Sequence, residues 1–263
     1  MRTVLLDADT ELYRVALRNE HVEDWGDGDP AVTCDHQTAR DELRAYVDDI
    51  KATLFADEVI VALTDYEKPN FRKAFYPEYK AKRGPKPAML PALRKFMVDN
   101  FKTYIRPTLE ADDIVGILST HPTLIRGEKI IVSIDKDLMT IPGLLFNPDK
   151  HKEPVEILPK DAYMFFLTQV LIGDTTDNYP GCPGIGPVNA ALILDVVKKQ
   201  TPRSLWDAVV DVFEASTLKG ESRGLTANDA LIQARCARIL RNTEYNAKTK
   251  QVILWQPPQR KKR

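Results

Sequence analysis

The sequence TVLLDAD at residues 3–9 is a short apolar run that ends in two aspartates. The pattern returns in EVIVALTD at residues 58–65 and in KIIVSIDKD at residues 129–137. Short continuous apolar runs are typical of parallel strands that are buried on both faces. We therefore predict a mostly parallel sheet in which an aspartate follows each of these strands.

Apolar residues recur at helical spacing between these strands and after them. The helical patterns cover residues 12–17, 43–50, 114–118, 159–171, 205–213 and 227–240. Strands that alternate with helices predict an α/β fold whose central sheet is flanked by helices. Residues 144–147 and 155–158 are expected to add short strands, whereas the polar residues 22–36 are expected to form an exposed loop.

Carboxylates accumulate where the predicted strands end and where one predicted helix begins. Single aspartates after strands are common turn residues, and acids at a helix start can simply cap the helix. Their recurrence instead predicts an acidic cluster at the carboxyl edge of the sheet, where α/β folds bind ligands. The carboxylates concerned are Asp7, Asp9, Asp65, Glu110, Asp112, Asp113, Asp135, Asp137, Asp174 and Asp177.

So much negative charge would raise the pKa values of these groups and destabilise the fold unless cations bind there. Oxygen ligands suit Mg²⁺, with Mn²⁺ as its substitute, and none of the four histidines stands at a strand end, which argues against zinc. Two ions about 4 Å apart can activate water and stabilise the leaving oxygen of a phosphodiester. The residues alone therefore indicate a metal-dependent phosphodiesterase that acts on nucleic acid.

The stretch LIGDTTDNYPGCPGIGPVNAALIL at residues 171–194 combines two carboxylates with a glycine-rich turn. Asp174 and Asp177 are three residues apart at an expected helix end, so both can face one cation. Gly181, Gly184 and Gly186 would let the backbone approach a phosphate, towards which a helix starting near Pro187 would point its free amides. The alternative is an ordinary helix-loop-helix with a solvated acidic cap.

Residues 68–106 are rich in bases and interleaved with aromatic side chains. Cations and ring faces together suit a phosphate backbone and exposed bases, although a solvated basic face with buried rings is the alternative. Five prolines break the segment, so we expect short helices in an arch-like region. The bases are Lys68, Arg72, Lys73, Lys80, Lys82, Arg83, Lys86, Arg94, Lys95, Lys102 and Arg106, and the aromatic residues are Phe71, Phe75, Tyr76 and Tyr79.

Composition limits the class of protein. A net charge of −1 over 263 residues means that any nucleic-acid surface must arise from local segregation of charge. Three isolated cysteines, Cys34, Cys182 and Cys236, argue against a disulfide framework and are expected to be packing residues in a reducing compartment. With no signal peptide or membrane-length apolar run evident, we expect a soluble, cytoplasmic protein with no membrane partner.

Five motifs, in order and spacing, resemble the signatures of the 5′ nuclease superfamily, which includes flap endonucleases and phage 5′ to 3′ exonucleases. The motifs are DADTELYR at 7–14, TDYEKPNFRKAFYPEYKAKR at 64–83, EADD at 110–113, IDKDL at 134–138, and GDTTDN at 173–178 followed by GCPGIG at 181–186. The resemblance implies a PIN-like α/β core with a basic helical arch and a helix-three-turn-helix. By size, the chain looks most like the free-standing phage or bacterial members.

The resemblance implies three parts of the chain. An α/β nuclease core would span residues 1–170 and include the arch at about 66–106. A helical DNA-binding subdomain with the helix-three-turn-helix would span residues 171–258, and a basic tail would span 259–263. The implied activity is exonuclease or flap endonuclease action on DNA, or on RNA-DNA hybrids, by a monomer. Its role would be in replication, primer removal or DNA degradation, in the host cytoplasm if a phage encodes it.

The resemblance also assigns roles to individual residues. One metal site would comprise Asp7, Asp65, Glu110, Asp112 and Asp113, which Asp135, Asp137, Asp174 and Asp177 would complete or extend to a second. Lys80 and Arg83 would contact the scissile phosphate and act in catalysis together with Asp7 and Asp65. Contacts to DNA, some through a turn that often binds K⁺, would come from Arg14, Arg72, Tyr79, Lys80, Arg83, Gly181, Gly184, Ile185, Gly186 and Asn189.

The chain departs from the family pattern at two places. The family usually has glycine where Ala8 stands and no acid where Asp9 stands, so Asp9 is either an additional ligand or a bystander. Val188 and Asn189 replace the lysine and arginine that commonly touch phosphate after the GIG turn. Duplex binding there would therefore depend more on backbone amides and a cation.

Two other functions fit part of the sequence. DADT at residue 7 and GDTTDN at residue 173 resemble motifs of haloacid-dehalogenase-type phosphatases, in which Asp7 would be the nucleophile. That hypothesis leaves EADD, YKAKR and the GIG turn unexplained. A non-catalytic DNA-binding module would use the basic segment but would have no need for the acidic cluster.

Overall fold

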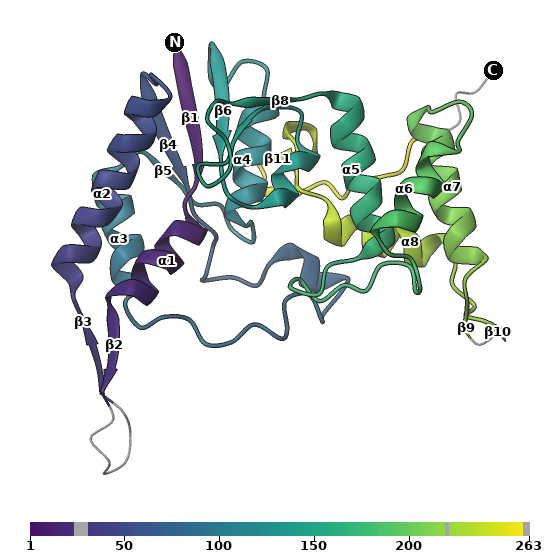
Figure 1. Ribbon diagram of the computed structural model, residues 1–263, viewed down its shortest axis with the longest axis horizontal. Helices are drawn as coiled ribbons and strands as arrows, with labels where there is room; N and C mark the ends of the chain where they lie inside the picture. Colours follow the sequence, from purple (N-terminus) through teal and green to yellow (C-terminus); the bar gives the residue numbers. More distant parts are fainter. Residues whose placement is uncertain (24–30, 219–220, 260–263) are drawn as a thin grey trace. The chain divides into compact units, whose positions relative to one another are not determined.

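The computed structural model describes residues 1–23, 31–218 and 221–259 (Figure 1). The chain forms two compact units. Unit 1 comprises Met1–Lys68, Gly84–Leu138 and Gly143–Glu156, and unit 2 comprises Pro69–Arg83, Met139–Pro142 and Ile157–Arg263. The segment 66–106 is thus shared between the units, and the three-part division expected from the sequence stays a prediction.

The central sheet has six strands in the order β5-β4-β1-β6-β7-β8. Strand β1 pairs in parallel with both β4 and β6, and the pairs β4-β5 and β6-β7 are parallel as well. The predicted mostly parallel sheet is confirmed. The strands are β1 (Arg2–Asp7), β4 (Glu58–Ala62), β5 (Thr103–Tyr104), β6 (Glu128–Val132), β7 (Gly143–Phe146) and β8 (Val155–Ile157).

Helices cover both faces of the sheet in unit 1. Val4 and Leu6 of β1 share a core with α1 (Asp9–Asn19), α2 (His36–Thr53) and α3 (Leu90–Asn100), which Figure 1 shows grouped together. Successive side chains of a strand point to opposite faces. Leu5 and Asp7 therefore face the other side, where α4 (Ala111–Thr120) contacts β1, β4 and β6.

Two segments differ from the sequence-based expectation. The expected polar loop at 22–36 instead includes part of an antiparallel pair, β2 (Glu20–Glu23) and β3 (Ala31–Cys34), while residues 24–30 lie outside the described part of the chain. Alternation of apolar and polar residues was too short there to indicate strands. The basic tail expected at 259–263 also lies outside the described residues, except for Gln259.

Unit 2 is built mainly from helices. Tyr163, Phe166, Trp206 and Trp255 pack in its core, where the Phe166 and Trp206 rings lie 5.3 and 5.1 Å from the Trp255 ring. The helices are α5 (Pro159–Ile172), α6 (Pro187–Asp195), α7 (Pro202–Glu214) and α8 (Ala227–Ala237), with short pairs β9 (Thr217–Leu218) with β10 (Glu221–Ser222) and β11 (Tyr245–Asn246) with β12 (Gln251–Val252). Among the described residues, no helix has both the length and the apolar character needed to cross a membrane.

Gly173 and Gly181 bring two backbone segments of unit 2 into direct contact. Gly173 ends α5 with φ +71°, and Gly181 has φ +65°, a region that favours glycine. A Cβ atom on Gly173 would lie 2.4 Å from the backbone carbon of Pro180, and one on Gly181 would lie 2.3 Å from the nitrogen of Gly173. Close backbone packing therefore explains Gly181, which the sequence suggested for approach to a phosphate.

We expect Gly173→Ala to lower the free energy of unfolding by about 3 kcal/mol, because it adds a left-handed backbone penalty to a steric clash. Chemical denaturation followed by circular dichroism measures the change. Gly84→Ala is the control, since a Cβ atom there meets nothing within 4 Å. Equal stability of the two variants would contradict the argument.

Candidate metal centre

Parallel pairing brings three predicted carboxylate positions to one edge of the sheet. Strands β4, β1 and β6 are neighbours and run in the same direction, so their carboxyl ends coincide. Asp7 is the last residue of β1, Asp65 follows β4 and Asp135 follows β6. The predicted acidic edge of the sheet is thus present in unit 1.

Asp7 is buried and its carboxylate has a defined partner. Its residue is only 8% exposed, and the Ser133 hydroxyl donates to Oδ2 over 2.9 Å. Ser133 in turn accepts a hydrogen bond from the amide of Asp135 over 3.0 Å. Burial, followed by the charges of Asp9 and Asp135, raises the pKa of Asp7 to about 7.

Asp9 lies at the start of α1 and is held by two partners. The Thr64 amide donates to Oδ2 over 3.1 Å, and Arg94 Nη1 lies 3.2 Å from Oδ1. Burial is the main cause that raises the pKa of Asp9, the charge of Glu110 adds to it, and Arg94 opposes it. The sequence pointed to neither Ser133 nor Arg94 as part of this cluster.

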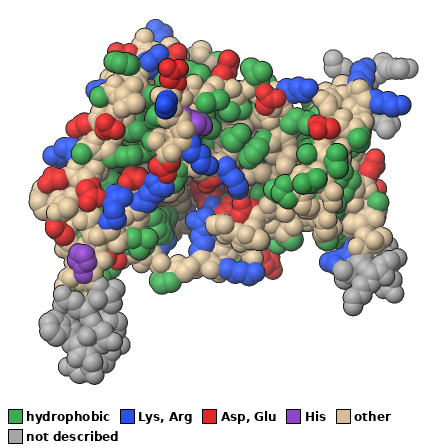
Figure 2. Space-filling model, viewed as in Figure 1, with side chains coloured by type: hydrophobic (Ala, Val, Ile, Leu, Met, Phe, Trp, Pro, Cys, Tyr) green, Lys and Arg blue, Asp and Glu red, His purple; other side chains and the backbone are tan. Residues whose placement is uncertain are grey.

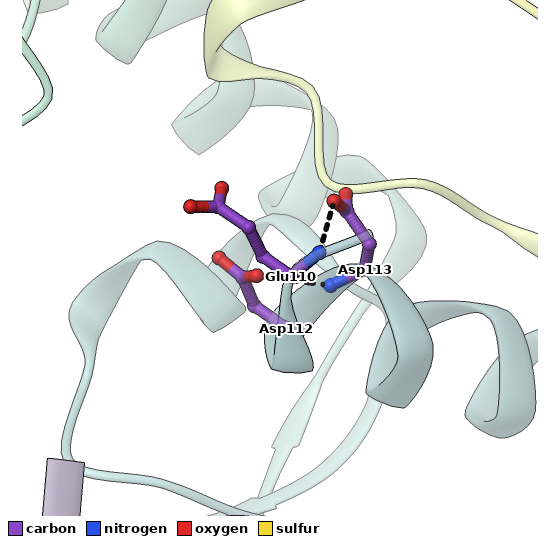
Figure 3. A group of neighbouring side chains, drawn as sticks. All are labelled: Glu110, Asp112 and Asp113. Carbon is purple, nitrogen blue, oxygen red and sulfur yellow. Dashed lines mark hydrogen bonds between the residues drawn. The ribbon is translucent and has the colours of Figure 1, made fainter. Parts of the chain in front are cut away.

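Glu110, Asp112 and Asp113 form the densest group of carboxylates at the start of α4. One oxygen from each lies within 4.8 Å of the others. Figure 3 shows the carboxylates of Glu110 and Asp112 on the same side, whereas that of Asp113 turns to the Glu110 amide, which donates to it over 3.3 Å. Asp113 therefore caps the helix as well as contributing charge.

This set of donors fits a hard divalent cation. Carboxylate oxygens are the ligands that Mg²⁺ and Mn²⁺ prefer, and their charges repel one another without a cation. The carboxylates of Glu110 and Asp112 lie on the same side, so we expect these two residues to hold an ion. Asp113 is completely buried, and its charge would stabilise a cation there from within the fold.

Asp65 and Asp137 lie in the segments that follow β4 and β6. The Asp65 carboxylate accepts hydrogen bonds from the amides of Glu67 and Thr108, each over 2.9 Å. Asp137 forms an ion pair with the adjacent Lys136 over 3.0 Å, and its amide donates to Asp135. The carboxylates of Asp65 and Asp135 shape the turns at the sheet edge, and the roles of Asp65 and Asp137 as metal ligands stay predictions.

Asp174 and Asp177 belong to unit 2 and follow the end of α5 instead of lying on it. Asp174 Oδ1 accepts hydrogen bonds from the amides of Thr176 and Asp177 and so stabilises the turn. Asp177 instead faces side chains of the YKAKR motif. Its partners are Tyr79 at 2.9 Å, Arg83 at 3.1 Å and Lys80 at 3.4 Å.

Two residues expected to contact DNA are buried in unit 2. Arg72 is 1% exposed and donates to the carbonyls of Cys236 and Arg238 near the end of α8. Tyr79 is 2% exposed, so its ring has no free face on which a base could stack. The sequence-based interpretation is corrected for both, because their rings and charges stabilise the core of unit 2.

Apart from the buried Gly181, the other expected DNA contacts are exposed or partly exposed. Arg14 binds Asp149 through both terminal nitrogens, the shorter contact being 2.6 Å. Gly186 precedes α6, which begins at Pro187 as expected, and Asn189 is exposed on its first turn. Gly184 has φ +81° and open space around its Cβ position, and Ile185 is partly buried.

We expect the metal-free protein to lose stability as the pH rises from about 4 to 7, because native Asp7 retains a proton that the unfolded chain releases in that window. Asp7→Asn should remove much of this loss and be more stable than the wild type above about pH 7. Thermal unfolding in EDTA across this pH range measures the loss of stability. Asp48→Asn, on the exposed face of α2, is the control. A variant that loses stability as steeply as the wild type would contradict the role of Asp7.

Comparison with known proteins identifies the family. The model of the 5′-3′ exonuclease N-terminal resolvase-like domain matches residues 2–145. An exodeoxyribonuclease of Enterobacteria phage T3 is 30% identical, covering 97% of this chain and 92% of its own length. An exonuclease of Escherichia phage T7 is also 30% identical, and a flap endonuclease Xni of Shewanella oneidensis is 31% identical over 51% of this chain and 56% of its own length.

A solved structure shares the fold. The T5 5′-exonuclease with bound divalent zinc ions matches with a TM-score of 0.64 and 15% identity, over 90% of this chain and 89% of that protein. The match extends the similarity to the helical part of the chain, beyond the residues covered by the family model. The chain is therefore an enzyme of the 5′-3′ exonuclease family, within the 5′ nuclease superfamily.

Proposed function

We propose that this protein is a metal-dependent 5′ nuclease that hydrolyses phosphodiester bonds of DNA, as a 5′ to 3′ exonuclease, a flap endonuclease or both. The observation that carries the proposal is the buried acidic edge of unit 1, where Asp7, Asp9 and the Glu110 group repel one another. A site that tolerates such repulsion is suited to divalent cations. The activities named for the phage T3 and Xni relatives agree with this chemistry.

Mg²⁺, replaceable by Mn²⁺, is the proposed cofactor, with two ions per active site. Bound divalent ions would neutralise charge at the phosphate and activate the attacking water. In unit 1, the first ion would be held, directly or through water, by Asp7, Asp65, Glu110, Asp112 and Asp113. Asp135 and Asp137 would complete this site or contribute to the second. The roles of Asp174 and Asp177 as metal ligands stay predictions.

Lys80 and Arg83 are proposed to contact the scissile phosphate. The side chains of Lys80 and Arg83 both form ion pairs with Asp177. Lys80 also has an unusual backbone φ of +54°. Such strain in a non-glycine residue is often retained where a side chain must be placed for function. Asp177 would hold the side chains of Lys80 and Arg83 in place until DNA binds, and the two side chains would then contact the phosphate.

Duplex DNA is proposed to bind unit 2 at a helix-three-turn-helix formed by α5, α6 and the turn between them. The first turn of α6 offers backbone amides to a phosphate, with Gly186 at the N-cap. Val188 is 74% exposed there and supplies no charge, so amides and a K⁺ ion would carry the contact. The face in Figure 2 mixes acidic and basic side chains, so DNA binding would rely on local groups.

The phosphatase hypothesis is disfavoured because it leaves the EADD, YKAKR and GIG motifs unexplained. The relatives with named activities are nucleases. A replication, primer-removal or DNA-degrading role, action on RNA-DNA hybrids and a monomeric state complete the proposal. The same acidic edge also separates it from a purely DNA-binding module.

The protein with Mg²⁺ should release nucleotides or short oligonucleotides from 5′-labelled duplex or flapped DNA. Asp135→Ala combined with Asp137→Ala should abolish cleavage but retain DNA binding, because it removes ligands and not phosphate contacts. Asp48→Ala with Asp49→Ala, on the exposed face of α2, is the matched control and should cleave normally. Cleavage that persists in excess EDTA, or turnover of small phosphate esters without action on DNA, would contradict the proposal.

Lys80→Met should slow single-turnover cleavage more than tenfold while changing the Kd for DNA less than about threefold, because a contact made mainly in the transition state affects chemistry more than binding. Lys160→Met, on the exposed side of α5, controls for the loss of one positive charge. Rapid-quench kinetics and fluorescence anisotropy give the two quantities. Equal losses in rate and affinity would make Lys80 a binding contact only.

A further inference from the structure

Arg94 belongs to the basic segment but does not lie on the exposed face of α3. Its side chain is 12% exposed, compared with 75% for the adjacent Lys95. Its Nη1 lies 3.2 Å from Asp9 Oδ1, and its Nη2 donates to the backbone carbonyl of Thr64. The guanidinium carbon is 4.0 Å from the centre of the Tyr66 ring. These contacts fix the guanidinium group in one place.

Asp9 uses both carboxylate oxygens in this arrangement. Oδ1 faces Arg94, and Oδ2 accepts the amide hydrogen of Thr64 over 3.1 Å. The side chain of Asp9 is 19% exposed, so water screens the ion pair only weakly. Asp9 thus has a cation of the protein itself as its counter-charge.

Thr64 and Asp65 form a turn after β4, and this turn is hydrogen-bonded to the segment that leads into α4. Thr64 Oγ1 accepts a hydrogen bond from the amide of Ala111 over 3.0 Å. The next residue, Asp65, donates its amide to the carbonyl of Leu109 and accepts the amide hydrogen of Thr108, each over 2.9 Å. Residues 108–111 include the backbone of Glu110, so the turn determines where the acidic group of α4 begins.

We infer that Arg94 is a positioning residue for the acidic cluster of unit 1. By binding Asp9 and Thr64 it fixes the turn that holds Glu110 and Asp112 in place, and it neutralises Asp9 so that Asp9 is not a metal ligand. The inference rests on the proposed function, because it concerns how the cluster receives a divalent cation. The inference also gives a role to Asp9, an acid at a position where the family usually has none.

Binding of Mn²⁺ to the full chain without DNA tests the inference. Electron paramagnetic resonance of free Mn²⁺ gives both the Kd and the number of bound ions. Arg94→Gln should weaken binding roughly tenfold, a common size for the loss of a group that orients metal ligands. Arg44→Gln is the matched control, because Arg44 also contacts α3, through Asn100 at 3.1 Å and the Phe96 ring at 5.3 Å.

Asp9→Asn should keep the number of bound ions of the wild type. Combined with Arg94→Gln, it should return the Kd to within about threefold of the wild-type value, because removing both partners leaves no unpaired buried charge. If Arg94 acted only through its hydrogen bond to the Thr64 carbonyl, the double variant would bind Mn²⁺ as weakly as Arg94→Gln. If circular dichroism shows that Arg94→Gln alone does not fold, the double variant tests the inference by itself. Its Kd for Mn²⁺ must then lie within about threefold of the wild-type value.

Several outcomes would overturn the inference. They are unchanged or tighter Mn²⁺ binding by a folded Arg94→Gln variant, loss of an ion in Asp9→Asn, and a double variant that binds more than about threefold more weakly than the wild type. A wild-type protein that binds no Mn²⁺ and does not cleave DNA with Mg²⁺ would instead refute the proposed function. The two failures are therefore distinguishable.

Discussion

Repulsion among carboxylates at the carboxyl edge of a parallel sheet is the constraint on which the rest of unit 1 depends. Parallel pairing of β4, β1 and β6 forces the ends of these strands together. Burial removes the water that would stabilise the ionised carboxylate, and the charges of Asp9 and Asp135 add to this, so the pKa of Asp7 rises to about 7. This repulsion destabilises unit 1 at the sheet edge, and hydrogen bonds to the carboxylates, such as those at Asp7 and Asp9, partly offset it.

Those hydrogen bonds give most of the carboxylates a second task. Asp65 bonds the segment after β4 to the segment that leads into α4, and Asp113 caps α4 while it lies completely buried. A side chain that accepts backbone amides is held in one rotamer, so its charge is fixed in direction. The same contacts that stabilise the turns therefore preorganise the donors for a cation.

The sequence predicted the features that depend on local pattern. Apolar runs and the residues after them were enough to place β1, β4 and β6 and the acids at their ends, because parallel strands share one direction. Burial of individual polar side chains was beyond this reasoning. Arg72 and Tyr79 stand in a basic, aromatic segment that resembles a DNA-binding surface, yet tertiary packing places both in the core of unit 2.

Arg94 and Ser133 show the same limit at the acidic edge. Arg94 is one of eleven bases in its segment, and only the packing of α3 against α1 brings it to Asp9. The two neighbouring aspartates of the first motif then differ in physical character. Asp9 is balanced by a cation that the protein cannot lose, whereas Asp7 is met by a neutral hydroxyl and by two like charges. A carboxylate in the second situation gains most from an exchangeable cation, so Asp7 is the aspartate of that motif that we expect at the metal centre.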